Sequence, residues 1–127
     1  EPARYALLFG SPVPGYDAPA EQTTGPGTRV IVALIELYQR AVDADAIDAK
    51  STVPVPPALA ADCERIRSQF ALTTPDDVIA RGVLAWAALF GAVNFEVFGQ
   101  YGPETFTDPS ALFEHNLGVL VETVGFR

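Results

Sequence analysis

The chain has 127 residues, of which 49% are hydrophobic and 19% are charged, as expected for a single domain with a sizeable core. Eight basic and 16 acidic side chains give a net charge of −8, so the chain by itself is ill suited to binding DNA, RNA or an anionic membrane. The single Cys63 excludes an internal disulfide, and the absence of methionine together with the first residue, Glu1, predicts a fragment or a processed chain.

No targeting or membrane-spanning segment is expected. The first residues lack the charged and then apolar pattern of a secretory signal. The uncharged stretch over residues 82–95 is shorter than the ~20 residues that cross a bilayer. A single cysteine fits a reducing compartment. The sequence therefore predicts a soluble, cytoplasmic protein without a membrane partner.

Prolines divide the chain into a broken first half and a more regular second half. Of the 11 prolines, none lies between residues 75 and 103, so long helices are possible there. The first half is expected to contain, in chain order, the end of a helix over residues 4–9, a loop over 11–25, an amphipathic helix over 27–42 and a shorter helix over 58–70.

The second half is expected to contain two longer helices. Thr74 is predicted to cap a helix over residues 75–98, whose first turn carries two carboxylates. Asp108 is followed by a proline and starts a helix over residues 109–124, which Gly125 ends. No segment shows the alternating pattern of a strand.

The predicted fold class is all-α, a helical bundle in one domain over residues 1–127. The helix over residues 75–98 is apolar on more than one face, and the last helix shows a milder excess. Because one small chain offers few partners to cover this surface, we expect the last two helices of two chains to form a four-helix dimer interface. The alternative is that all these residues belong to an internal core. The expected interface residues are Val78, Gly82, Ala85, Leu89, Ala92, Phe95, Phe113, Leu117, Leu120 and Val124.

Three segments of the sequence resemble parts of one known domain. Residues Trp86–Gly99 resemble the penultimate helix of the WHG-type C-terminal domain of TetR-family transcriptional regulators. Residues Tyr5–Tyr16 resemble a helix end and loop of the same domain, and Leu112–His115 resemble its last helix. The histidine that gives this domain type its name is replaced here by Phe90, ahead of Gly91. Any ligand role of that histidine therefore does not carry over.

This resemblance implies a domain that dimerises and senses an effector. It implies that a separate N-terminal helix-turn-helix domain, absent from this sequence, binds DNA and responds to the effector. The acidic charge and the incomplete first helix agree with this expectation. The implied partners are a second copy of the chain, a small apolar effector and, only through the N-terminal domain, DNA. No cofactor, metal ion or catalytic activity is expected.

Five residues are expected to line an effector pocket: Tyr38, Phe70, Trp86, Phe90 and Asn94. The last three follow one another at steps of four, so they share one face of the predicted helix. A mostly apolar pocket with one or two polar groups suits a small hydrophobic effector. The alternative is that the aromatic side chains only pack and that the Asn94 amide bonds to the backbone.

Other polar residues are expected to have no metal-binding or catalytic role. Asp43, Asp45 and Asp48 form a carboxylate cluster, but no glycine turn or distal glutamate completes a calcium loop, which favours a solvated helix end. His115 is the only histidine and is expected at a surface or an interface. The acidic neighbours of Cys63 are expected to disfavour its thiolate.

The sequence offers no arrangement that catalysis requires. It has one histidine and one cysteine, and none of its serines lies in a Gly-x-Ser-x-Gly turn. Two alternatives to a regulatory domain stay open. One is a stand-alone helical carrier or enzyme acting on apolar ligands, and the other is a purely structural dimerisation domain.

Overall fold

The computed structural model describes residues 1–9, 20–48 and 53–127 of the chain. In these residues it has five α-helices: α1 (Pro2–Phe9), α2 (Ala20–Asp43), α3 (Pro57–Phe70), α4 (Asp76–Val97) and α5 (Pro109–Val124). The β-type pairing of the described ranges is limited to an isolated antiparallel bridge between Ile47 and Phe126. The predicted all-α fold is confirmed.

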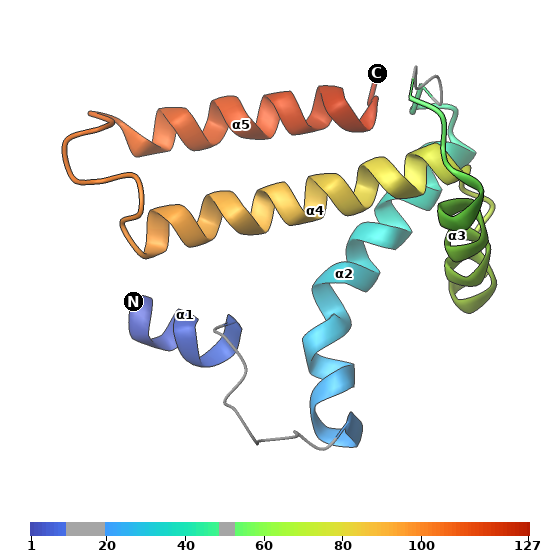
Figure 1. Cartoon of the computed structure of the whole chain (residues 1–127), viewed down its shortest axis with the longest axis horizontal. Helices are drawn as coiled ribbons and strands as arrows, with labels where there is room; N and C mark the ends of the chain where they lie inside the picture. Colours follow the sequence, from blue (N-terminus) through green and yellow to red (C-terminus); the bar gives the residue numbers. More distant parts are fainter. Residues whose placement is uncertain (10–19, 49–52) are drawn as a thin grey trace.

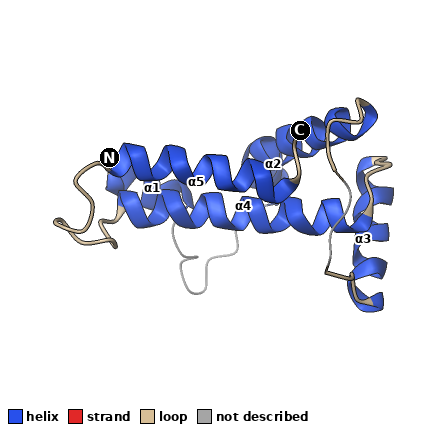
Figure 2. Cartoon of the chain, turned by 90° about the horizontal axis from the view of Figure 1, so that it is seen from above, coloured by secondary structure: helices blue, strands red, loops and turns tan. Residues whose placement is uncertain are grey.

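Helix α4 is the element around which the others are arranged. It lies antiparallel to α5 and beside it, as both views show (Figure 1, Figure 2). Helix α3 packs at the first turns of α4, and α2 passes the same half of α4 (Figure 1). Helix α1 lies against the other half, where the ring of Tyr5 is 5.8 Å from that of Phe98 and the ring of Phe9 is 5.4 Å from that of Phe90.

The ends of α5 follow local signals in the sequence. The Asp108 carboxylate accepts a hydrogen bond of 3.0 Å from the backbone N–H of Ala111, which satisfies one free donor of the first turn. Gly125 follows the last turn with a φ of 92°, a conformation that strains any residue with a side chain. Both predicted boundaries of this helix are confirmed.

The prediction that Thr74 caps α4 is wrong. Pro75 occupies the position before the helix, and no side chain caps it. The Thr74 hydroxyl instead donates a hydrogen bond of 2.9 Å to Oε1 of Gln39 on α2. The first turn of α4 still carries Asp76 and Asp77, whose negative charges the helix dipole favours.

Helix α2 begins at Ala20, earlier than the predicted start at residue 27. The predicted loop over residues 11–25 is therefore wrong for its last residues, while residues 11–19 lie outside the described part of the chain. Pro26 directly precedes the predicted start, and proline costs least in the first turn of a helix. In the structure Pro26 lies in the second turn, where its missing N–H removes one backbone hydrogen bond.

The buried core lies where α2, α4 and α5 meet. It contains Ala41, Val78, Ala85 and Val124, together with Ile47 from the segment that follows α2. Burying one such aliphatic side chain as large as valine contributes about 1.5–3 kcal/mol. Away from this core, many apolar side chains of α4 and α5 are partly exposed.

Arg81 joins α4 to the end of α5 and to the segment that follows α2. Its Nη1 donates to the carbonyl of Val124 at 2.6 Å, and its Nη2 donates to the carbonyl of Asp48 at 2.8 Å. Nη2 also donates to the Asp77 carboxylate at 3.0 Å. A Cβ atom at Gly125 would lie 2.5 Å from Nη1, so the guanidinium occupies space that only a glycine leaves free. Arg81 therefore fixes the end of α5 against α4.

Candidate ligand pocket

An apolar cavity of about 220 Å³, called here the first cavity, lies between α2, α3 and α4. No charged side chain lines it. Its wall is formed by Ile31, Leu34, Ile35 and Tyr38 of α2, Ile66 and Phe70 of α3, Leu72 and Thr74 of the connecting segment, and Val78, Ile79, Gly82, Val83 and Trp86 of α4.

Helical spacing brings these side chains to one place. Val78, Gly82 and Trp86 follow one another at steps of four on α4, so they lie on one face of the helix. Ile31 and Tyr38 lie two turns apart on the facing side of α2. The result is a cavity whose wall on α4 extends from Val78 to Trp86.

Tyr38 of α2 approaches the α4 backbone at Gly82. A Cβ atom at Gly82 would lie 3.0 Å from Cε2 of the Tyr38 ring, so the absence of a side chain lets the ring lie on the α4 backbone. Burial raises the pKa of Tyr38 above its ordinary value of 10.0. The phenol is therefore uncharged at neutral pH, and the cavity keeps an uncharged wall.

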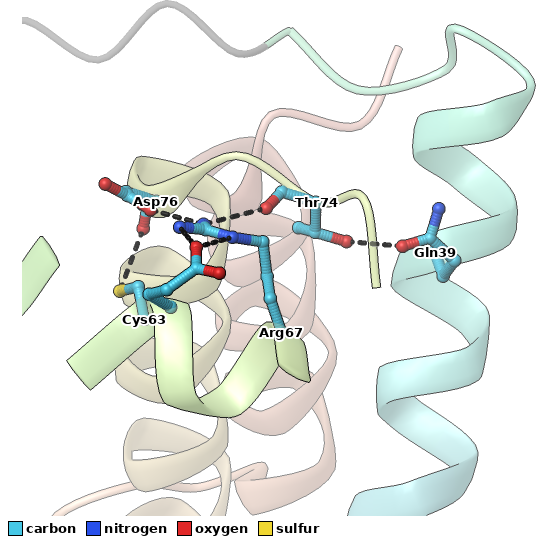
Figure 3. Close-up of polar contacts among 6 residues, drawn as sticks. Gln39, Cys63, Arg67, Thr74 and Asp76 are labelled. Carbon is cyan, nitrogen blue, oxygen red and sulfur yellow. Dashed lines mark hydrogen bonds and ion pairs between the residues drawn. The ribbon is translucent and has the colours of Figure 1, made fainter. Parts of the chain in front are cut away.

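Thr74 of the first cavity wall belongs to the Gln39 cluster, which consists of Gln39, Thr73 and Thr74. Figure 3 shows the bond between Thr74 and Gln39. The backbone N–H of Thr73 donates to Gln39 Oε1 at 2.9 Å, and the Thr74 hydroxyl donates to the same oxygen at 2.9 Å. Gln39 Nε2 donates to the Thr73 hydroxyl at 2.7 Å and to the Asp43 carboxylate at 2.7 Å. These bonds hold the segment between α3 and α4 against α2.

Arg67 holds α3 against the start of α4 next to Thr74 (Figure 3). Its guanidinium pairs with the Asp76 carboxylate and with Glu64, whose Oε2 lies 2.8 Å from Nη2. Nη1 also donates to the carbonyl of Thr74 at 3.3 Å. The bonds to both carboxylates raise the pKa of Arg67, which stays charged.

Cys63 lies beneath this ion pair and is almost fully buried, with its Sγ 3.7 Å from the carbonyl oxygen of Asp76. Burial is the first cause that raises the pKa of the thiol, and the Asp76 charge is the second. Asp62 also raises the pKa, while Arg67 lowers it. The predicted disfavoured thiolate is confirmed, but burial contributes more than the adjacent charge that the sequence suggested.

Comparison with known proteins assigns the family. Residues 1–120 match the family described as Tetracyclin repressor-like, C-terminal domain. The chain belongs to this family. It is also 41% identical over 120 residues to the HTH-type transcriptional regulator Rv1816 of Mycobacterium tuberculosis and, equally, to the HTH-type transcriptional regulator Mb1846 of Mycobacterium bovis. The match covers 94% of this chain and 51% of each relative, so the chain spans about half the length of the curated relatives it matches.

Family membership confirms the resemblance seen in the sequence and agrees with the all-helical fold. It also bears on how the strongly apolar composition of α4 is interpreted. By length and composition alone α4 could cross a membrane. However, it begins with two carboxylates, carries Arg81 bonded to the end of α5, and packs against neighbouring helices. We interpret α4 as a packing helix of a TetR-type domain.

The first cavity of the TetR-type domain brings together three of the five predicted pocket residues. Tyr38, Phe70 and Trp86 line it. Phe90 is not part of its wall, because the ring packs between those of Phe9 and Trp86, at 5.4 Å and 5.2 Å. The Asn94 side-chain amide donates to the Phe90 carbonyl at 2.8 Å, which is the backbone bond that the alternative interpretation described.

Sequence reasoning missed several residues of this cavity. Thr74 supplies its polar wall and is only 3% exposed. A threonine directly before an apolar helix can cap that helix or be buried with a hydrogen-bond partner. The sequence shows the threonine, but it does not show that Gln39, which lies much earlier in the chain, is the partner of Thr74. Gly82 was predicted at a dimer interface, and in the structure its lack of a side chain allows Tyr38 of the same chain to lie against α4.

The ten predicted interface residues do not share one outer face of the TetR-type domain. Val78 and Gly82 line the first cavity, because α2 covers that side of α4. A second cluster faces α2 from α4 and α5: Ala85, Leu89, Leu117, Leu120 and Val124. The remaining residues, Ala92, Phe95 and Phe113, lie on the side of the α4–α5 pair near Tyr101.

Three of the predicted interface residues, Ala92, Phe95 and Leu120, belong to an open apolar groove along α4 and α5, called here the outer α4–α5 face. Its floor contains small residues of α4, and its edges are Phe95 and Val119, each 46% exposed. Leu84 precedes this floor by one helical turn and is 58% exposed. The groove residues are Ala88, Gly91, Ala92, Phe95, Tyr101, Asn116, Val119 and Leu120.

None of the acidic residues, the cysteine or the histidine singled out in the sequence lines the first cavity or the outer α4–α5 face, although Asp43 accepts a hydrogen bond from Gln39. Asp45 has a positive φ of 51° just after α2, and its carboxylate is 3.7 Å from the Arg127 guanidinium. His115 and Glu96 are exposed. In the described ranges, no group of three histidine, cysteine or acidic side chains is placed to hold a metal ion.

Proposed function

We propose that this TetR-type domain is the effector-binding and dimerisation part of a transcriptional regulator that acts in the cytoplasm. DNA binding would belong to a separate N-terminal helix-turn-helix segment, as the names and the length of the relatives suggest. The observation that carries the proposal is the uncharged cavity between α2, α3 and α4. It lies next to α4, the helix that also forms the outer α4–α5 face.

The first cavity supports a small, uncharged and largely apolar effector. A cavity of about 150 Å³ in another protein, lined only by apolar side chains, stays dry and binds benzene. The present cavity is somewhat larger, at about 220 Å³. A carboxylate or ammonium group in this cavity would lose its hydration without gaining an opposite charge. The wall therefore selects against ions.

The outer α4–α5 face supports pairing with a second copy of the chain. Its partly exposed apolar edges surround a floor of small residues, and together they form a patch that one chain leaves uncovered. The same patch on a second copy would cover it around a two-fold axis and complete a four-helix interface. The interface proposed from the structure therefore uses Leu84, Ala88, Gly91, Phe95 and Val119.

Shared use of α4 couples the two sites. An effector shifts a conformational equilibrium only if it binds one arrangement more tightly than another. A ligand in the first cavity contacts α4 at Val78, Gly82 and Trp86, and so it favours the position of α4 that fits it. We propose that this changes the angle between the paired domains and hence the distance between two DNA-binding segments.

The effector proposal is tested with matched ligands and thermal unfolding. Benzyl alcohol is expected to raise the Tm of the purified chain, since a ligand at about 100 times its Kd stabilises by about 2.7 kcal/mol. Benzoate, which has the same ring and a negative charge, is expected to have no effect. The Ile66→Trp substitution, which fills the first cavity, should abolish the benzyl alcohol shift. Equal shifts with wild type and variant, or no shift with any uncharged compound, would contradict the proposal.

A further inference from the structure

A second cavity of about 170 Å³ lies on the other side of Trp86, between α2, α4 and α5. Leu37 of α2, Ala85 and Leu89 of α4, and Leu117 and Val121 of α5 contribute to its wall. Like the first cavity, it is lined without a charged side chain. It differs in lying next to α5, so its occupant would contact both long helices.

Three side chains separate the two cavities. Leu34, Tyr38 and Trp86 belong to both walls, so each has one side toward α3 and the other toward α5. The two rings are held by neighbours outside the partition, since Tyr38 lies 5.9 Å from the ring of Phe126 and Trp86 lies 5.2 Å from that of Phe90. Leu34 is the only aliphatic member of this partition, and a side chain of this type can change rotamer.

Thr74 is one of two residues with a hydroxyl group in the wall of the first cavity, the other being Tyr38. The backbone N–H of Thr73 can only donate, so the Gln39 atom that receives it at 2.9 Å must be the carbonyl oxygen. The Thr74 hydroxyl, 2.9 Å from that same oxygen, must then be the donor. Its proton is therefore used, and its oxygen lone pairs are left to accept a hydrogen bond from a ligand.

The direction from Thr74 to the second cavity follows α4. The partition begins where Tyr38 meets α4 at Gly82, six residues after Asp76, which corresponds to about 9 Å along the helix axis. The second cavity then extends beyond Trp86 toward Leu89. A ligand that reaches from Thr74 into the second cavity must therefore be elongated.

We propose that the two cavities form one tunnel for an elongated, uncharged ligand with a hydrogen-donating head and an alkyl chain. The head, such as a primary alcohol, donates to Thr74 Oγ1. The chain passes between Leu34, Tyr38 and Trp86 and ends beside α5. This inference rests on the proposed effector-binding function and adds the ligand's shape, its lack of charge and its orientation.

The test measures dissociation constants of linear primary alcohols from butanol to decanol by calorimetry. Each added methylene that is buried is expected to tighten binding about fourfold, and the increase should continue through decanol in the wild type. The Leu117→Trp variant, which fills only the second cavity, should bind butanol and hexanol like the wild type and gain nothing beyond octanol. Leu89→Phe serves as a second filling variant from α4, in case the first does not fold.

Two controls separate the parts of the proposal. Ile66→Trp, at a residue that lines only the first cavity, should weaken the binding of every alcohol. Thr74→Val should weaken each alcohol about fivefold without changing the gain per methylene, because it removes one hydrogen bond at the head. Octanoate at neutral pH should bind at least about tenfold more weakly than octanol.

The outcomes distinguish this inference from the proposed function. If wild-type affinity stops rising at hexanol, or if Leu117→Trp and Leu89→Phe match the wild type through decanol, the tunnel is wrong while an effector in the first cavity stands. If octanoate binds as tightly as octanol, the uncharged head is wrong. If neither the alcohols nor benzyl alcohol bind, the proposed effector function itself fails.

Discussion

Tyr38 of α2 lies directly on Gly82 of α4, with a distance of only 3.0 Å between Cε2 of its ring and the position that a Cβ atom at residue 82 would take. This contact fixes both the width of the first cavity and one wall of the partition. Glycine is otherwise unfavourable inside a helix, by about 1 kcal/mol relative to alanine. The contact with Tyr38 explains its presence at a buried position of α4.

The Gly82→Ala variant is expected to separate stability from ligand binding. Its free energy of unfolding should change by less than about 1 kcal/mol, because the gain in helix propensity offsets displacement of the Tyr38 ring. Octanol binding should weaken about three- to tenfold, because the displaced ring enters the cavity. The matched control is Gly118→Ala on α5, where a Cβ meets nothing within 4 Å. This control should become more stable by about 0.5–1 kcal/mol with unchanged binding, as urea denaturation and calorimetry would show.

Removal of Gln39 is expected to loosen the segment between α3 and α4 beside the first cavity. Gln39→Ala should lower the free energy of unfolding by about 1–3 kcal/mol, because the buried Thr74 hydroxyl and the Thr73 N–H both lose their acceptor. Gln69→Ala, on the exposed side of α3, should change it by less than about 0.5 kcal/mol. Urea denaturation measures both values. Similar losses in the two variants would show that the Gln39 cluster does not contribute specifically.

Arg81 is partly buried and Arg65 is exposed, so replacing each of them compares what a buried and an exposed charge contribute to the free energy of unfolding. Arg81→Ala should destabilise by about 3 kcal/mol or more, since the carbonyls of Val124 and Asp48 lose charged donors. Arg65→Ala removes only an exposed ion pair with Asp62 and should cost less than about 1 kcal/mol. Chemical denaturation checks the order. An equal effect of both substitutions would contradict the role given to Arg81.

Cys63 is expected to make the free energy of unfolding depend on pH in the alkaline range. Because burial raises the pKa of the thiol above 9.0 in the folded state, the unfolded chain loses this proton at a lower pH than the folded chain does. The contribution of the Cys63 thiol to the free energy of unfolding is therefore fully present below the pKa of the thiol in the unfolded chain. It is lost as the pH rises through the pKa of the thiol in the folded chain. The free energy of unfolding should fall more steeply above about pH 9 in the wild type than in Cys63→Ala. Parallel pH profiles in the two proteins would contradict this prediction.

The outer α4–α5 face makes a prediction about association. Val119→Lys should convert a dimer into a monomer in analytical ultracentrifugation, because the charge would be buried in a paired interface without an opposite charge. Leu7→Lys on α1 is the matched control, since Leu7 is also apolar and is 87% exposed. The control should remain dimeric. A monomeric wild type, or loss of the dimer in the control alone, would exclude the proposed face.

Local signals in the sequence were sufficient for α3 and α5 because their ends depend on nearby residues. The Asp108 cap reaches only to Ala111, and Gly125 ends α5 through its own backbone conformation. The start of α2 could not be predicted in this way, because the local preference of Pro26 for a first turn does not decide where the helix begins.

The candidate pocket was predictable only in part, for a related reason. Helical spacing placed Trp86, Phe90 and Asn94 on one face, but it could not show that α1 covers Phe90 while α2 and α3 enclose Trp86. It also could not show which apolar side of α4 meets α2. Residues such as Ala85 were therefore predicted at a dimer interface although they lie in the core. What the sequence does not show is which helix covers each face of α4.

Helix α4 separates the ligand side from the partner side by its own thickness, about 10 Å including side chains. Residues 78, 82 and 86 face one way, and residues 84, 88, 91 and 95 face the other. If the proposed function holds, substitutions on the cavity side would alter ligand preference without changing the proposed pairing surface. Related regulators could then diverge in the molecules they detect while keeping the same quaternary structure.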